Sequence, residues 1–168
     1  MTLLTHAIVG ASAGKIFGGN IWIGALAAFL SHFLIDVIPH GSYPLNLTAN
    51  LPDRRNPENN FIVIDKSFFK DLIKMGADFF LGLIFAQLFW NGPSLEIDNE
   101  VLLFSLLGTL PDALQFVYYK LRIEPLTSLQ KFHLFIHTKL HFDDNPKIAI
   151  LVETATSFAS VLIAKLLV

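Results

Sequence analysis

Apolar residues gather in five long stretches of the chain, and most polar residues lie between them. A helix needs about 17–25 residues to cross the hydrocarbon core of a bilayer. We therefore expect five membrane-spanning helices, of which the first is short enough to be tilted or partly re-entrant. The predicted spans run from Thr2 to Phe17, Ile21 to Pro39, Ser67 to Trp90, Val101 to Leu121, and Ile148 to Val168.

Two of the connections between these stretches have patterns of their own. The loop from Gly41 to Asp65 is rich in Pro, Asn and Arg and shows no helical period. The segment from Leu126 to Phe142 mixes apolar residues with His and Lys, which is typical of an amphipathic helix at the membrane interface. The pattern predicts one all-α domain over residues 1–168, a membrane-embedded bundle of about five spans with one interfacial helix.

The composition supports a membrane protein and excludes several functions. Hydrophobic residues make up 53% and charged residues 15%, with a mean hydropathy of +0.55, whereas soluble domains carry about 25% charged residues. A net charge of −2 and the lack of a Lys/Arg stripe exclude an electrostatic nucleic-acid binder. The chain has no cysteine, so disulfides, thiolate nucleophiles and Cys-bound zinc are excluded as well.

The charges of the loops predict an orientation. Lys and Arg gather around residues 54–74 and 120–147, whereas residues 91–100 contain three acids and no base. Basic loops stay on the cytoplasmic side, and the first ten residues lack the basic start of a removable signal peptide. We therefore expect an integral protein of a bacterial-type inner or plasma membrane with a cytoplasmic N-terminus.

Ionisable residues inside apolar spans are costly and are functional candidates by default. At ~1.5 Å per residue, nearly all those of this chain lie within roughly 15 Å of the predicted cytoplasmic face. Two of the acids could equally be interhelical hydrogen-bond partners, namely Asp78 and Glu153. Near the interface, His40 and His141 could be solvated or capping groups. The remaining candidates are His6, His32, Asp36, Asp112, His133 and His137.

The spacing of these residues predicts how they face. His32, Asp36 and His40 are four residues apart, as are His133, His137 and His141, so each set is expected to form one line along a helix. If the first two spans turn at residues 18–20, a single antiparallel register pairs three sets of positions. These pairs are His6 with His32, Gly10 with Ala28, and Gly14 with Gly24.

Imidazole and carboxylate groups without thiolate suit Zn²⁺, Mn²⁺ or Fe²⁺. Two ligands four residues apart can hold one ion from a single helix face. We expect a divalent cation, zinc first, on the six remaining candidates named above.

Short motifs add a family resemblance. Thr5-His6 followed by Gly10, the segment Gly108-Thr-Leu-Pro-Asp112, and the segment from His133 to Thr138 resemble motifs of the membrane-bound metal-dependent hydrolases. These proteins are also called LexA-binding, inner membrane-associated hydrolases. Through them the chain distantly resembles the zinc-dependent phospholipase C superfamily, whose His-x-x-x-Asp pairs are similar to His32 and Asp36.

The resemblance implies a metal-dependent hydrolase at the cytoplasmic membrane face, acting on a phosphoester of a lipid or a membrane-associated substrate. Asp112 and His137 are then the catalytic candidates, with His137 as a ligand or general base. This chain departs from the family where Ala113 follows Asp112 in place of a further acid, and His40 could replace a missing ligand. The loop from Gly41 to Asp65 could cover the site.

Two other functions fit the same residues. Chains of Asp, Glu and His also form proton or metal-ion relays in transporters, and buried polar groups also serve packing in non-catalytic membrane interaction proteins. A metal assay separates the packing function from the other two, and a flux assay in liposomes separates transport from hydrolysis. Membrane lipids are the expected partners, and no nucleic acid is expected.

Overall fold

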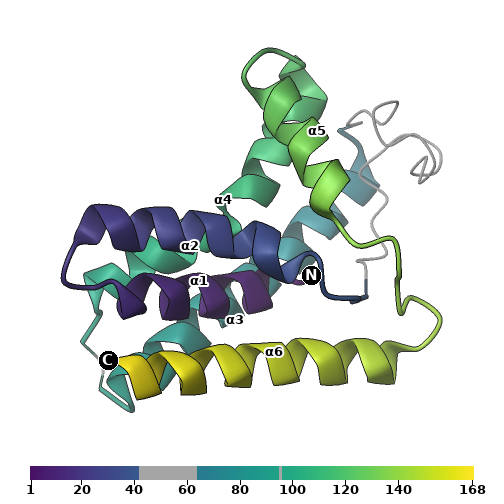
Figure 1. Cartoon of the computed structure of the whole chain (residues 1–168). Helices are drawn as coiled ribbons and strands as arrows, with labels where there is room; N and C mark the ends of the chain where they lie inside the picture. Colours follow the sequence, from purple (N-terminus) through teal and green to yellow (C-terminus); the bar gives the residue numbers. More distant parts are fainter. Residues whose placement is uncertain (42–63, 95) are drawn as a thin grey trace.

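A computed structural model describes residues 1–41, 64–94 and 96–168, and within them the chain is all-helical with no β-strand (Figure 1). The predicted all-α fold is thereby confirmed. Most of the loop that could cover the site, residues 42–63, lies outside the described residues. The six helices are α1 (Leu3–Ile16), α2 (Ile21–Ile35), α3 (Lys66–Asn91), α4 (Asn99–Leu121), α5 (Leu126–Ile136) and α6 (Pro146–Leu167).

Three of the helices, not five, are long and apolar enough to cross a membrane. They are α3, α4 and α6, and their bounds lie within two residues of the predicted spans. With 14 and 15 residues, α1 and α2 reach only about 21–23 Å, short of a hydrocarbon core of about 30 Å. The prediction of about five spans was wrong because the turn at residues 17–20 limits the first helix to 14 residues, too few to cross. Pro39 also disfavours helix in the residue before it, and α2 ends at Ile35.

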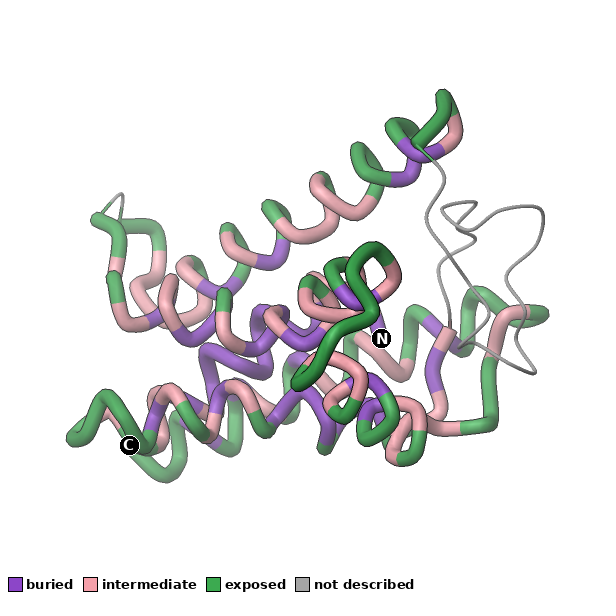
Figure 2. The backbone as a smooth tube through the Cα atoms, turned by 90° about the horizontal axis from the view of Figure 1, so that it is seen from above, coloured by how far each residue is buried: buried purple, intermediate pink, exposed green. Residues whose placement is uncertain are grey.

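The first helix forms the centre of the bundle. It packs against α2, α3, α4 and α6, and Figure 2 shows the buried backbone gathered in the middle of the molecule. All residues from Thr5 to Ser12 are buried. A helix that is enclosed by other helices has no need of an amphipathic pattern, which explains why α1 can hold Thr, His and Ser among apolar residues.

Glycines let α1 approach its neighbours closely. A Cβ on Gly10 would lie 2.7 Å from the Cα of Gly108 in α4, and one on Gly108 would lie 2.5 Å from the carbonyl oxygen of His6. A Cβ on Gly24 would lie 2.9 Å from the carbonyl oxygen of Gly14, so α1 and α2 also meet as predicted there. The atoms nearest to a Cβ on Gly10 belong to α4, a contact that the register of the first two helices does not predict. Small residues at a helix crossing permit such backbone contact.

Two acids hold the start of α1. The backbone N–H of Leu4 donates to Oδ2 of Asp78 in α3 at 2.9 Å, and the hydroxyl of Thr2 donates to Oε2 of Glu153 in α6 at 2.6 Å. The first N–H groups of a helix have no partner within the helix, and an anion there also complements the helix dipole. Asp78 and Glu153 are therefore interhelical hydrogen-bond partners, one of the two roles considered for them.

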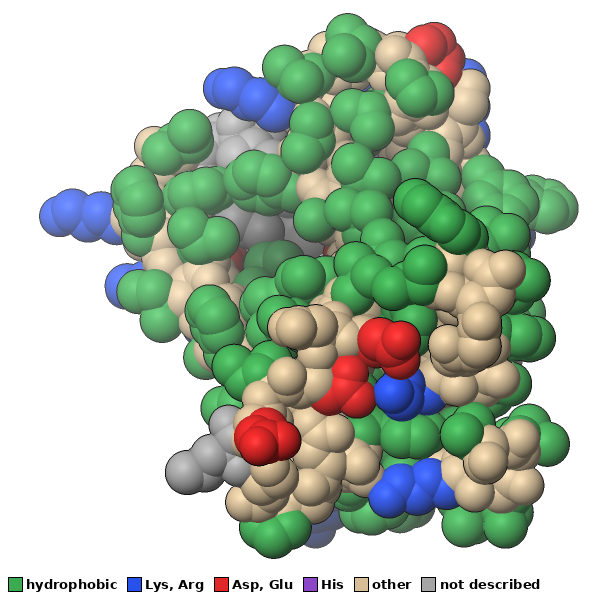
Figure 3. Space-filling view, turned by 90° about the vertical axis from the view of Figure 1, so that its left-hand side faces the viewer, with side chains coloured by type: hydrophobic (Ala, Val, Ile, Leu, Met, Phe, Trp, Pro, Cys, Tyr) green, Lys and Arg blue, Asp and Glu red, His purple; other side chains and the backbone are tan. Residues whose placement is uncertain are grey.

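The outer surface of the bundle is mostly apolar. Large apolar side chains such as Leu81, Ile84 and Leu162 are about half exposed or more, as expected for helices that face lipid. Figure 3 shows a mostly apolar face on which a few acidic and basic side chains lie close together. Near the turn between α1 and α2, Nζ of Lys15 lies 3.1 Å from carboxylate oxygens of both Asp98 and Glu100.

Candidate metal centre

Four helices bring the predicted ligands together at the end of the bundle opposite the turn between α1 and α2. His6 lies in the first full turn of α1, and His32 and Asp36 lie at the end of α2. Asp112 follows Pro111 within α4, and His133 lies near the end of α5. All of these side chains are buried except that of Asp112, which is 23% exposed.

Asp36 lies among three imidazole rings. Its Oδ2 accepts a hydrogen bond from Nε2 of His133 at 2.8 Å and lies 3.2 Å from Nε2 of His32. Its Oδ1 lies 3.3 Å from Nε2 of His6. The backbone nitrogen of Met1 also donates to Oδ1 at 3.2 Å. One carboxylate thus has the Nε2 atoms of three helices within hydrogen-bonding distance.

Asp112 approaches the same imidazoles from the side of α4. Its Oδ1 lies 3.6 Å from Nε2 of His32, and its Oδ2 lies 3.9 Å from Nε2 of His6. These two rings are stacked with their centroids 3.9 Å apart, which confirms the predicted pairing of His6 with His32. Both carboxylates therefore face one pair of stacked rings.

The hydrogen bond of Nδ1 determines which nitrogen of His32 carries the proton in the neutral ring. Nδ1 of His32 donates to the carbonyl oxygen of Gly108 at 2.9 Å, so in the neutral ring Nε2 carries a lone pair. This atom lies 3.3 Å from Nε2 of His133, 3.2 Å from Oδ2 of Asp36 and 3.6 Å from Oδ1 of Asp112. A lone pair on Nε2 and the two carboxylates would repel each other. A cation between them, either a proton on Nε2 or a metal ion, removes the repulsion. An imidazole held through its other nitrogen is the usual arrangement of a metal ligand.

His6 is unusual in that neither of its ring nitrogens makes a hydrogen bond within the described residues, although the side chain is 1% exposed. A buried polar atom without a partner costs free energy. Coordination of an ion by Nε2 would satisfy this atom. The donor set and the unsatisfied ring together fit a divalent cation.

The third histidine of each predicted line lies beyond the end of its helix. α2 ends at Ile35 and α5 at Ile136, so His40 and His141 lie in the segments that follow these helices, and the prediction of a single helical line was wrong for both. These two segments pair instead. His40 and His141 form a parallel bridge, in which the N–H of Phe142 donates to the carbonyl of His40 at 3.0 Å.

This pairing places His137 between the two groups of histidines. Its ring centroid lies 5.8 Å from that of His133 and 4.9 Å from that of His40. Burial lowers the pKa of His137, and burial lowers the pKa of His40 to about 4. Both rings are thereby kept neutral near pH 7, which is the form that binds metals. Because His40 is 1% exposed, the solvated role considered for it does not hold.

The chain has six histidines, and their rings form one continuous series. Each ring centroid lies within 6.0 Å of that of another histidine. Among the described residues, three overlapping groups have ligand atoms within 4.8 Å of one another and could hold a metal ion. These groups are His6, His32 and Asp36; His32, Asp112 and His133; and Asp36, His133 and His137.

All six predicted ligands thus fall into these groups. Two features that position them were not predicted from the spacing of residues in the sequence. The contact of Gly108 with both α1 and His32 is one, and the anchoring of α1 by Asp78 and Glu153 is another. Gly108 does stand in a short motif with Asp112, which is the one signal in the sequence that points to it.

No protein-family model, no curated protein and no solved structure matches this chain. The resemblance to membrane-bound hydrolases therefore rests on the short motifs named above.

Proposed function

We propose that this chain is an integral membrane, metal-dependent hydrolase that cleaves phosphoester bonds at the cytoplasmic membrane face. The observation that carries the proposal is the convergence of three imidazole Nε2 atoms and two carboxylates from four helices, 2.8–3.9 Å apart. Mixed His and carboxylate sets are typical of catalytic zinc, manganese and iron sites.

His6, His32, Asp36, Asp112 and His133 would hold the ion, with His137 as a further ligand or as a base. When bound, such an ion supplies a Lewis acid that polarises a phosphoryl oxygen and makes a water more acidic. In hydrolysis the oxygen of water forms a bond to phosphorus, the bond from phosphorus to the ester oxygen breaks, and the alcohol leaves with a proton.

Burial suggests different roles for the residues of this site. Asp36 is 1% exposed and its oxygens lie within 3.3 Å of three imidazoles, so it suits a ligand that stays in place. Asp112 and His137 are partly exposed and lie at the edge of the cluster, so they can contact a substrate. His137, whose Nδ1 donates to the carbonyl of Thr138 at 3.1 Å, has its Nε2 free to accept a proton.

The test combines metal content with catalysis. Protein purified in detergent is analysed for bound metals, and hydrolysis of the chromogenic diester bis-p-nitrophenyl phosphate is then measured before and after chelation. The proposal requires about one or more equivalents of a divalent metal and hydrolysis that stops on chelation and returns with zinc or manganese.

A matched pair of variants removes the contribution of contaminating enzymes. Asp36→Asn should abolish both metal and hydrolysis, whereas Asp144→Asn, at an exposed position after α5, should change neither. Hydrolysis that is equal in all three proteins, or that survives in metal-free protein, would contradict the proposal. Metal binding without hydrolysis, together with zinc flux in liposomes, would favour the transporter instead.

A further inference from the structure

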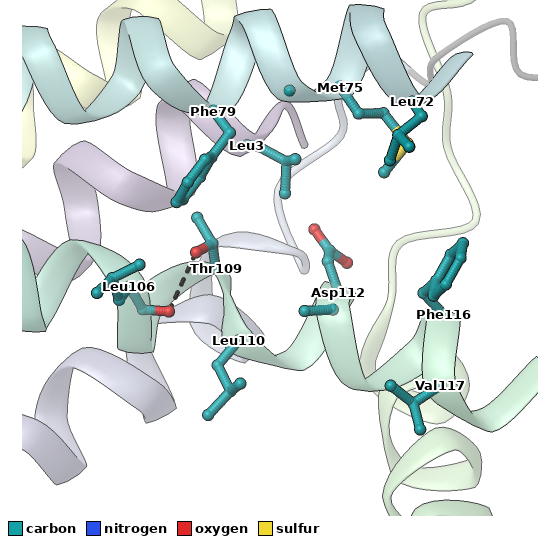
Figure 4. A pocket seen from close by; sticks show the side chains of 12 residues that line it. Leu3, Leu72, Met75, Phe79, Leu106, Thr109, Leu110, Asp112, Phe116 and Val117 are labelled. Atoms are coloured by element: carbon teal, nitrogen blue, oxygen red, sulfur yellow. Dashed lines mark hydrogen bonds between the residues drawn. The ribbon is translucent and has the colours of Figure 1, made fainter. Parts of the chain in front are cut away.

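An apolar groove runs between α3 and α4 beside the candidate metal centre. Its volume is about 530 Å³, within the range of ligand-binding pockets. Leu72, Met75 and Phe79 line it from α3, and Leu110 and Phe116 line it from α4 (Figure 4). Leu3 closes it from the start of α1.

One lining residue joins the groove to the metal centre. Asp112 is the only ionisable residue among those that line the groove, and Figure 4 shows its carboxylate pointing into the space between the two helices. The same carboxylate lies 3.6 Å from His32 and 3.9 Å from His6. A molecule in the groove would therefore extend from an apolar channel to a cluster of metal-binding groups.

The groove offers no other strong polar contact. The hydroxyl of Thr109 donates to the carbonyls of Leu106 and Ser105 in its own helix, at 3.0 and 3.2 Å. The other residues that line the groove have apolar side chains, apart from Gly76, which has none. Such a surface favours an apolar occupant with one polar end at Asp112.

The groove also faces the region where lipid chains would lie. α3 and α4 are both candidate membrane spans, and the lining residues Leu72 and Leu106 are 47% and 43% exposed. In a bilayer these side chains contact acyl chains rather than water. An occupant can therefore enter sideways from the membrane.

We propose that the groove binds one acyl chain of a phospholipid and thereby places the phosphoester of that lipid at the metal centre. This inference rests on the proposed function and narrows its substrate to a lipid. The ester that is cleaved then lies next to Asp112, and the chain of the lipid lies along Met75, Phe79 and Phe116.

Gly76 provides a way to fill the groove without straining the fold. A Cβ added at this position meets no atom within 4 Å, and the residue lies on the groove wall. Gly76→Leu would place a branched side chain where the acyl chain would lie. Ala77→Leu makes a similar addition one residue later, at an exposed position outside the groove lining, and serves as the control.

The experiment measures the hydrolysis of two substrates by the full chain in detergent. One is a long-chain phosphatidylcholine, and the other is bis-p-nitrophenyl phosphate, which has no acyl chain. Gly76→Leu should lower kcat/KM for the lipid at least tenfold and leave that for the short diester within twofold, while Ala77→Leu changes neither. Equal kcat/KM for the lipid in Gly76→Leu and the wild-type protein would overturn the proposal, as would an equal loss with both substrates.

A binding measurement separates the groove from the catalytic function. A phosphatidylcholine with a fluorescent polyene chain is titrated onto each protein in detergent. At least tenfold weaker binding to Gly76→Leu than to Ala77→Leu would support the groove even if no protein hydrolyses either substrate, in which case the proposed hydrolase fails alone. Equal binding to both variants would overturn the groove and leave the hydrolase intact.

Discussion

Asp36 is the residue on which the candidate metal centre depends most directly. Its two oxygens lie within 3.3 Å of three imidazoles that come from three different helices. If the cation there is a metal ion, Asp36 is an anionic ligand. If the cation is only a proton on an imidazole, Asp36 is the partner of a buried ion pair. Replacement by Asn keeps the shape and removes the charge, so it distinguishes these two states.

We expect Asp36→Asn to lose metal and the stability that metal contributes. An ion that binds only the folded protein stabilises it by about 2.7 kcal/mol at a concentration of 100 times Kd. For a protein of this size that corresponds to roughly 5–10 °C in Tm. Chelator should lower the Tm of the wild-type protein by this amount and leave that of Asp36→Asn nearly unchanged. Equal insensitivity to chelator in both proteins would argue against metal at Asp36.

A second prediction concerns two positions in the histidine series, one near its middle and one at an end. His133 is buried and its Nε2 is within 2.8 Å of Asp36, whereas His141 is exposed and contacts the series through His137 and His40. We expect His133→Ala to lose most of its metal, measured by elemental analysis after dialysis, and His141→Ala to keep it. Loss of metal in His141→Ala alone would place the ion at the His141 end of the series.

At the scale of the helices, the crossing of α1 and α4 determines the geometry of the centre. Gly10 and Gly108 bring the two backbones into contact, and the carbonyl of Gly108 orients His32. α1 carries His6 one turn from this contact, and α4 carries Asp112 one turn from it. The separation of these two helices therefore influences the distance between His6 and Asp112.

We expect Gly108→Ala to destabilise the protein and weaken metal binding without changing a ligand. The new Cβ would lie 2.5 Å from the backbone carbonyl oxygen of His6, and such overpacking costs about 1–3 kcal/mol. Gly10→Leu should act in the same way. Stability and metal affinity are measured by thermal unfolding and by competition with a chelating dye.

Gly76→Ala is the control for this prediction. Its Cβ meets no atom within 4 Å, and alanine favours helix over glycine by about 1 kcal/mol. The control should therefore be as stable as the wild-type protein or more so. Normal metal affinity in a folded Gly108→Ala protein would show that the crossing does not set the ligand geometry.

The observed helix contacts also show which parts of the site are predictable from the sequence. The pairings of His6 with His32 and of Gly14 with Gly24 follow from helical periodicity and a tight turn, and both were predicted correctly. Periodicity says nothing about which third helix packs against a glycine, so the contact of Gly10 with Gly108 was missed. The four-residue spacing of the histidines also continues beyond the ends of α2 and α5. For this reason His40 and His141 were wrongly predicted to lie on those helices.

At the scale of the whole molecule, the distribution of charge predicts one orientation in the membrane. The chain has no cysteine, so single cysteines can be introduced as accessible markers. A cysteine at Ser94, between α3 and α4, should react with an impermeant thiol reagent added outside intact cells. A cysteine at Lys139, beyond α5, should react only after the membrane is opened. Both positions are exposed.

The reverse labelling pattern would place the metal centre on the outer face and contradict the proposed orientation. Labelling of both positions from outside would contradict the arrangement of α4 as a crossing helix. If α3, α4 and α6 each cross the membrane, the described part of the chain has an odd number of crossings. The two ends of the described chain are then expected on opposite sides.

The central position of α1 has a consequence for biosynthesis. α1 leaves the ribosome well before α6, and the carboxylate that binds its Thr2 belongs to Glu153, 151 residues later. At roughly 5–20 residues per second, α1 waits about 8–30 s for this partner. During that time its buried Thr, His and Ser lack their final neighbours, and α1 is too short to be held by the bilayer alone. We therefore expect α1 to remain accessible to proteases or chaperones until α6 is inserted. In chains whose synthesis is stalled before Glu153, added protease should cleave α1.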